Sequence, residues 1–167
     1  MNCKSKLTSK LIASSLLLAG IVTFAPKATA NPVDIDFAVN VTPSCAFSNV
    51  TGGVLVPPTT GTTFTTSSNG TATLTCNTTT ATLDIAQPTE GANPASATSM
   101  DFSGTITPPA TSGVTATNIT NATANQAGIN LGLGANDISL SMRATLPSGA
   151  IPAGNYVYTV TLTANPN

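Results

Sequence analysis

The chain has 167 residues, of which only 7% are charged and none is histidine. A typical globular domain carries about 25% charged residues, so the surface of this protein must consist mainly of Thr, Ser, Asn and backbone groups. Without histidine, the Ser-His-Asp and Cys-His nucleophile arrangements are excluded, and so is an unperturbed acid–base group near neutral pH.

Residues 1–30 have the pattern of an export signal. Three lysines open the segment, a mostly apolar stretch follows over Leu11–Ala25, and residues 28–30, Ala-Thr-Ala, form a small-x-small cleavage site. The apolar stretch is shorter than the roughly 20 residues that a membrane-spanning helix needs, which makes a retained anchor the less favoured alternative. We therefore expect the protein to leave the cytoplasm.

Cleavage after residue 30 would leave 137 residues, which suits a single domain. Four of the five Lys and Arg residues lie in the signal, and all six acidic residues follow it. The mature chain thus carries one cation, Arg143, against six anions, for a net charge of −5. One arginine cannot form the basic patch that nucleic acid requires, so no nucleic-acid partner is expected.

A strictly alternating segment follows the signal. Apolar residues occupy every second position over nine residues, which predicts a strand with one apolar face. The residues of that face are Val33, Ile35, Phe37, Val39 and Val41. We therefore divide the mature chain into an N-terminal segment, residues 31–44, and a β domain, residues 45–167. A strand placed ahead of the domain is free to pair with another molecule.

Two cysteines, Cys45 and Cys76, remain once Cys3 is lost with the signal. In an oxidising compartment an even pair predicts a disulfide, and two buried free thiols are the alternative. Closing this loop would stabilise the fold by roughly 3–4 kcal/mol if the effect is chain entropy. With no histidine and only two cysteines, neither a metal site nor another cofactor is expected.

Five further segments alternate with period two, and Pro and Gly residues separate them. Several short strands with one Thr- and Ser-rich face predict an all-β fold, a β-sandwich. The five segments are residues 72–76, 81–85, 129–133, 137–146 and 156–164. The regions Gln87–Ser99 and Thr107–Gly128 are poorly patterned, and we expect long loops or irregular edge strands there.

The final alternating run, Tyr156–Ala164, stops three residues before the end of the chain. If this run is the penultimate strand of an immunoglobulin-like sandwich, no sequence remains for the last strand. That arrangement predicts an incomplete sandwich, with an open groove, unpaired backbone and exposed core. The strand predicted over Val33–Val41 of a neighbouring copy would then fill the groove.

Carboxylates offer the main alternative chemistry. Asp34 and Asp36 share a strand face that we expect to be solvated, and Glu90 and Asp101 are isolated in the sequence. The acidic residues also lack the spacing of a calcium-binding loop. The two tyrosines could form a sugar-stacking platform, but packing in the core is the favoured interpretation. No catalytic site is visible.

The order of these features resembles a known family. The signal, the alternating segment, Cys45 and a Gly-rich stretch are followed by Gly70-Thr-Ala-Thr-Leu-Thr-Cys76, and Pro152-Ala-Gly-Asn-Tyr-Val-Tyr-Thr-Val-Thr-Leu-Thr-Ala164 closes the chain. This looks like the spore coat protein U-like domain and the related archaic chaperone–usher pilus subunits. The resemblance covers both ends of the mature chain and is diffuse in the middle.

The resemblance implies assembly by strand exchange. A periplasmic chaperone would lend a strand to each subunit, and an outer-membrane usher would replace it with the N-terminal segment of the next subunit. The five apolar residues of that segment would be the donor side chains, and the Cys45–Cys76 disulfide would join the first two strands of the domain. One wall of the acceptor groove would consist of Tyr156, Tyr158, Val160 and Leu162.

These observations predict a secreted structural subunit of a surface fibre (a pilus) or coat, with other subunits as partners and no catalysis. Its route would lead through the periplasm to the cell surface. The alternative is a self-contained sandwich that binds a carbohydrate or another surface ligand, with residues 33–41 paired within their own chain. A hydrolase that uses carboxylates is the third hypothesis.

Overall fold

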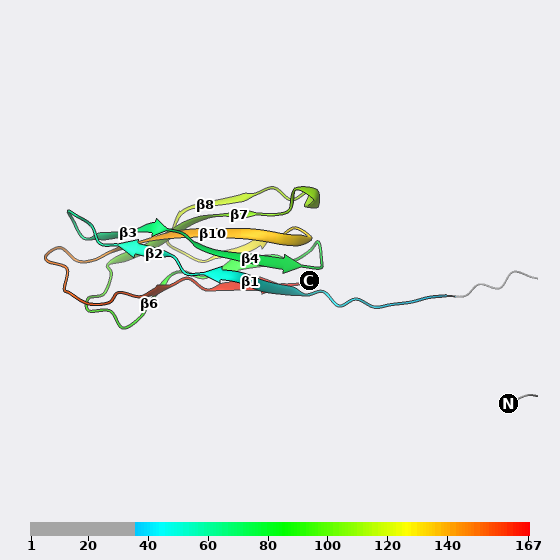
Figure 1. Ribbon diagram of the computed structural model, residues 1–167, viewed down its shortest axis with the longest axis horizontal. Helices are drawn as coiled ribbons and strands as arrows, with labels where there is room; N and C mark the ends of the chain where they lie inside the picture. The colour runs from blue at the N-terminus through cyan, green and yellow to red at the C-terminus, as the bar shows by residue number, and fades with distance from the viewer. Residues whose placement is uncertain (1–35) are drawn as a thin grey trace, which may run out of the picture. The chain divides into compact units, whose positions relative to one another are not determined.

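A computed structural model describes residues 36–167, which form an all-β structure with one short 3-10 helix (Figure 1). No helix in this range is long and apolar enough to cross a membrane. The elements are β1 (Cys45–Thr51), β2 (Val54–Val56), β3 (Thr63–Ser68), β4 (Gly70–Cys76), β5 (Thr82–Ile85), β6 (Thr89–Glu90), β7 (Ser99–Thr107), η1 (Ala110–Ser112), β8 (Thr117–Ala122), β9 (Gln126–Asn130), β10 (Gly134–Thr145), β11 (Tyr158–Thr159) and β12 (Leu162–Asn165).

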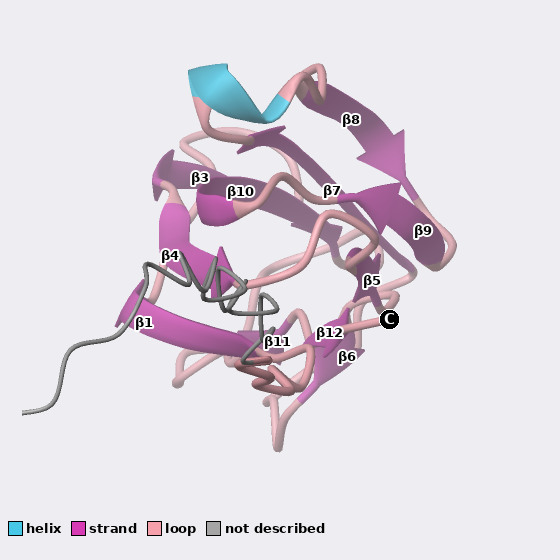
Figure 2. Cartoon of the chain, turned by 90° about the vertical axis from the view of Figure 1, so that its right-hand side faces the viewer, coloured by secondary structure: helices cyan, strands magenta, loops and turns pink. Residues whose placement is uncertain are grey.

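The strands form open antiparallel sheets, an arrangement consistent with a β-sandwich (Figure 2). The largest sheet has the order β1-β4-β10-β3-β2, and β7 pairs with both β10 and β8. The twelve-residue strand β10 organises this sheet, because β4 and β3 pair along one side of it and β7 along the other. A second sheet has the order β12-β5-β9, and β11 pairs with β6 in a small third sheet.

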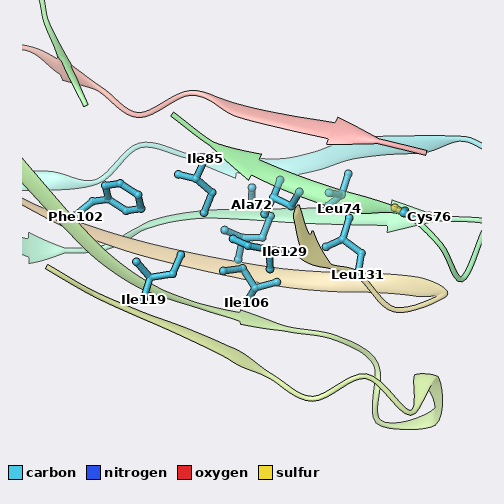
Figure 3. Close-up of a cluster of buried hydrophobic side chains, with 12 residues drawn as sticks. Ala72, Leu74, Cys76, Ile85, Phe102, Ile106, Ile119, Ile129 and Leu131 are labelled. Carbon is cyan, nitrogen blue, oxygen red and sulfur yellow. The ribbon is translucent and has the colours of Figure 1, made fainter. Parts of the chain in front are cut away.

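The main core lies between the two larger sheets (Figure 3). Alternate residues of β4 and β10 point into it, while the Thr and Ser residues between them face outward, as period-two alternation requires. Leu74, Leu83 and Ile85 are fully buried there, and Phe102 and Ile106 of β7 join them. The disulfide partner Cys76 is 2% exposed at the edge of this cluster.

A second, smaller cluster consists of Phe64, Ala144 and Leu146. The ring of Tyr156 packs against Phe64 with a centroid distance of 4.9 Å. Met142 is partly buried and packs against both clusters. The hydrophobic interior therefore has two parts, and the partly buried side chain of Met142 contacts both of them.

Asn136 is the buried polar residue of the described core. Its side-chain oxygen accepts a hydrogen bond from the Gly132 backbone N–H at 2.7 Å. Its amide nitrogen donates to the carbonyl oxygens of Leu74 at 3.2 Å, Gly132 at 2.8 Å and Gly134 at 3.0 Å. One side chain thus ties the loop before β10 to β4, and it satisfies backbone groups that burial would otherwise leave unpaired.

Asn136→Ala is expected to lower the free energy of unfolding by about 3 kcal/mol, because buried backbone carbonyls lose their donor. Urea unfolding followed by circular dichroism measures the change. Asn130→Ala, at an exposed position of β9, is the control and should stay within about 0.5 kcal/mol of the wild type. Equal effects of the two variants would contradict this role of Asn136.

The structure confirms the all-β prediction and locates strands within most of the alternating runs. The run over Tyr156–Ala164 is not one continuous strand, because the chain changes neighbours within it: β11 pairs with β6 and β12 with β5. Sequence analysis also leaves β7 unassigned, although this nine-residue strand is central to the sheet. In the poorly patterned regions, β6 is only two residues long and β8 lies at a sheet edge.

The strand predicted over Val33–Val41 lies only partly within the described residues. Val33 and Ile35 lie outside the described residues. Residues 36–44 belong to no strand. The side chains of Phe37, Val39 and Val41 are 93%, 87% and 68% exposed. The pairing of this segment with a sheet stays a prediction.

Candidate functional site

An open groove of about 530 Å³ runs along the domain between strands that are far apart in the sequence. Residues 50–55, from the end of β1 and from β2, line one wall. The residues over Tyr156–Leu162 line the opposite wall. Its floor consists of inward-facing side chains of β4 and β10, among them Ile138, Leu140 and Met142. The groove therefore opens directly onto the hydrophobic interior.

Both walls end in strand edges with no strand partner among the described residues. On one side, β1 pairs with β4 only and β2 with β3 only. On the other side, β12 pairs with β5 only and β11 with β6 only. At the end of the domain that carries the disulfide, β1 and β12 approach each other (Figure 1). The two edges present unpaired N–H and C=O groups, which favour the addition of another strand.

The side chains of the groove are apolar and incompletely covered. Alternate residues of the second wall, Tyr156, Tyr158, Val160 and Leu162, are all half-buried, whereas the residues between them are exposed. Three valines at the rim are largely exposed: Val50 at 73%, Val54 at 54% and Val157 at 46%. Contiguous exposed apolar surface of this kind marks an interaction site in soluble proteins.

Both hydrophobic clusters contribute to the groove. Leu140, Val160 and Leu162 belong to the border of the main core. Leu55, Tyr156 and Tyr158 belong to the border of the smaller cluster, and Met142 borders both. A set of side chains placed along the groove would therefore pack against both clusters and join them.

The two tyrosines of the groove have different environments. The Tyr156 hydroxyl donates a hydrogen bond to the carbonyl oxygen of Pro152 at 3.0 Å. The Tyr158 hydroxyl is enclosed and has no hydrogen-bond partner in the described part of the chain. Burial raises the pKa of Tyr158 above its ordinary value of 10.0, and the charges of Glu90 and Tyr156 raise it further.

Tyr158→Phe is expected to leave stability at neutral pH unchanged or to raise it slightly, because it removes a buried hydroxyl that makes no hydrogen bond. The matched variant Tyr156→Phe should cost about 0.5–1.5 kcal/mol, because it breaks the bond to Pro152. Urea unfolding of the two variants compares these effects. A larger loss in Tyr158→Phe than in Tyr156→Phe would contradict the assignment.

The raised pKa of Tyr158 predicts a dependence of stability on alkaline pH. The folded state holds the phenol proton more tightly than the unfolded state does, so this contribution is fully present below pH 10 and is lost as the pH rises through the folded pKa. A spectrophotometric titration at 295 nm should show an ionisation phase whose midpoint lies above pH 10. That phase should disappear in Tyr158→Phe, and loss of a phase centred at or below pH 10 instead would rule out the shift.

The predicted disulfide is present. Cys45 and Cys76 are bonded, and they lie directly opposite each other in the register of β1 and β4. The bridge thus joins the first two strands of the large sheet at their common end. A disulfide is favoured in oxidising compartments, so it agrees with export from the cytoplasm.

Three of the acidic residues have structural partners, and Asp36 is exposed in the segment before β1. Asp101 forms an ion pair with Arg143 at 3.1 Å, and Glu90 accepts a hydrogen bond from the backbone N–H of Ala97. Asp137 accepts from the Thr73 hydroxyl at 3.2 Å. Within residues 36–167, no group of three or more His, Cys, Asp or Glu residues could hold a metal ion. Asp34 lies outside the described residues.

Sequence reasoning missed one whole wall of the groove and its floor. Val50, Val54 and Leu55 lie in a short Gly-interrupted stretch with too few residues for an alternation to be recognised. Leu140 and Met142 belong to a predicted strand, but alternation does not reveal which inward-facing residues another strand covers. The apolar Val54-Leu55-Val56 run is the local sequence signal that could have pointed to this wall.

No family model, curated protein or solved structure matches this chain. The interpretation of the groove therefore depends on its own chemistry: apolar side chains, two free strand edges and an opening onto the core. These features fit an extended apolar peptide better than a polar small molecule, because they offer backbone hydrogen bonds along two edges and pockets for alternate side chains.

Proposed function

We propose that this protein is a structural subunit of a surface fibre, in which the N-terminal segment of one copy occupies the groove of another. The apolar groove between two free strand edges is the observation that carries this proposal. An inserted strand would pair with β1 and β2 on one side and with β11 and β12 on the other. It would thereby complete the sandwich and close both edges.

The alternation of the N-terminal segment suits this role. The five apolar residues at odd positions from Val33 to Val41 would point into the groove, and Asp34, Asp36, Ala38 and Asn40 would face outward. At 3.3 Å per residue, the segment from 33 to 41 extends about 26 Å as a strand, and the wall from 156 to 162 extends at most about 20 Å. The segment is therefore long enough to span the wall.

Burial supplies the driving force. Covering five such side chains contributes about 1.5–3 kcal/mol each, or on the order of 10 kcal/mol before the cost of ordering the segment. The strand would also cover the exposed valines of the rim and satisfy backbone groups on both edges. Such a joint would be non-covalent and long-lived.

An open apolar groove also explains the need for assembly partners. Before its groove is filled, a subunit would expose core side chains and free edges, which promote aggregation. We infer that a periplasmic chaperone covers the groove with a strand of its own and that an outer-membrane usher directs the exchange, as the family resemblance implies. Export and formation of the disulfide would precede this step.

Denaturing electrophoresis of protein recovered from its native cell surface tests the proposal. Without boiling, we expect a ladder of oligomers, because joints made by strand insertion resist detergent. Boiling should reduce the ladder to the monomer. A single monomer band in both lanes would overturn the fibre and leave the self-contained sandwich as the remaining hypothesis.

A further inference from the structure

One side chain holds the base of the N-terminal segment. The side-chain oxygen of Asn77 accepts a hydrogen bond from the backbone N–H of Ser44 at 2.6 Å, and its amide nitrogen donates to the carbonyl oxygen of Thr42 at 3.0 Å. The backbone N–H of Asn77 donates to the carbonyl oxygen of Ser44 at 3.0 Å. We call these three contacts of Asn77 with residues 42–44 the clasp.

The disulfide lies directly beside the clasp. Cys45 is the first residue of β1, Cys76 is the last residue of β4, and Asn77 follows it. Strand β4 pairs with β10 as well as with β1, and its inward-facing residues Ala72 and Leu74 are buried in the core. The bridge thus connects the start of β1 covalently to a strand inside the sheet.

Strand β1 by itself is weakly held. Within residues 36–167 it pairs with β4 alone, and an irregularity between Ser48 and Thr51 interrupts that pairing. Every residue of β1 after Cys45 is exposed. A force applied to the free end of an edge strand breaks its ladder bonds one after another, so β1 would detach before the rest of the domain if it carried the load.

We propose that the clasp and the Cys45–Cys76 bridge form a mechanical anchor, which transfers tension on the N-terminal segment to β4 without loading β1. The inference rests on the proposed function, because in a fibre each N-terminal segment carries the force between neighbouring copies. The bridge carries most of the load, and the clasp keeps residues 42–44 from being pulled away from the domain. Detachment of β1 would open one wall of the groove and release the strand that a neighbouring copy has inserted there. The anchor therefore protects this joint as well as the attachment of the subunit's own N-terminal segment.

Single-molecule force spectroscopy of the mature chain, with handles at its two termini, tests the anchor. With the disulfide intact, we expect no event before the main rupture of the domain. After reduction, an additional event at lower force should release the seven residues of β1, about 25 Å of chain. In the reduced protein, Asn77→Ala should shift this early event to still lower force. If the early event occurs at the same force with and without the Asn77 side chain, the clasp does not contribute to the anchor.

Attachment of the first handle at Asn69 instead of the N-terminus provides the control. Asn69 is exposed between β3 and β4, so force enters there without passing through the start of β1. Reduction should then add no early event. The anchor is overturned if the reduced chain ruptures in one step when pulled from its N-terminus, or if the early event occurs with both attachments.

The measurement uses monomers and is therefore independent of fibre formation. An early β1 event together with a monomer band on electrophoresis would support the anchor and overturn the fibre. A boiling-sensitive ladder without the early event would support the fibre and overturn the anchor.

Discussion

A chain that carries a second copy of residues 33–41 after Asn167, joined by a short flexible linker, is expected to unfold about 15 °C above the wild-type protein. The appended strand would turn back along β12 and fill the groove of its own molecule. Burial of five apolar side chains and pairing along two edges exceed the cost of ordering nine residues, for a net gain of about 5 kcal/mol. For a domain of this size, 1 kcal/mol corresponds to about 3 °C in Tm.

Differential scanning calorimetry measures this gain. The appropriate control is a chain with the same linker and appended segment, in which Asp replaces the copies of Phe37 and Val39. Two buried carboxylates cost several kcal/mol in an apolar groove, so the control should unfold close to the wild-type temperature. Equal Tm values for the two extended chains would mean that the groove does not select an alternating apolar strand.

The double variant Phe37→Asp with Val39→Asp is expected to abolish the ladder. Loss of two buried apolar side chains alone weakens each joint by about 4 kcal/mol, nearly a thousandfold in affinity, and burial of two carboxylates adds to this. Both side chains are about nine-tenths exposed in the single copy. The stability of the monomer should therefore change little, and calorimetry checks that the domain remains folded.

Ala38→Asp is the matched control for that variant. Position 38 lies between the two substituted positions and would face outward in the inserted strand, so the additional charge stays in water. The ladder should persist in this variant and remain sensitive to boiling. If Ala38→Asp and the double variant behave alike, charge in the N-terminal segment would account for the result, and the predicted alternation of inward and outward side chains would be wrong.

Several features of the fold are encoded locally and could be predicted. The Thr-rich alternation of β4 and β10 places one set of side chains in the core because successive residues of a strand point to opposite faces. The disulfide could also be predicted, since loss of Cys3 with the predicted signal leaves Cys45 and Cys76 as the one possible pair.

Other features depend on which strands become neighbours. Strand β7 was overlooked because Gly104 interrupts the apolar pattern of Met100, Phe102 and Ile106, and a glycine offers no side chain to count. In the structure Gly104 lies tightly against β10, where an added Cβ would clash with the backbone oxygen of Ser139 and with the side chain of Leu140. The contact that requires glycine is thus made with residues far along the chain.

The sequence by itself determined that residues 45–167 form an all-β domain with a disulfide between Cys45 and Cys76, and it singled out the alternating run ahead of Cys45. These properties follow from the alternation of side chains along a single strand and from the number of cysteines. Only the tertiary structure decided that residues 50–55, 138–142 and 156–162 surround one open groove. Alternation sets the face of a strand on which a side chain lies, whereas the pairing of distant strands decides which edges remain free and which apolar residues remain uncovered.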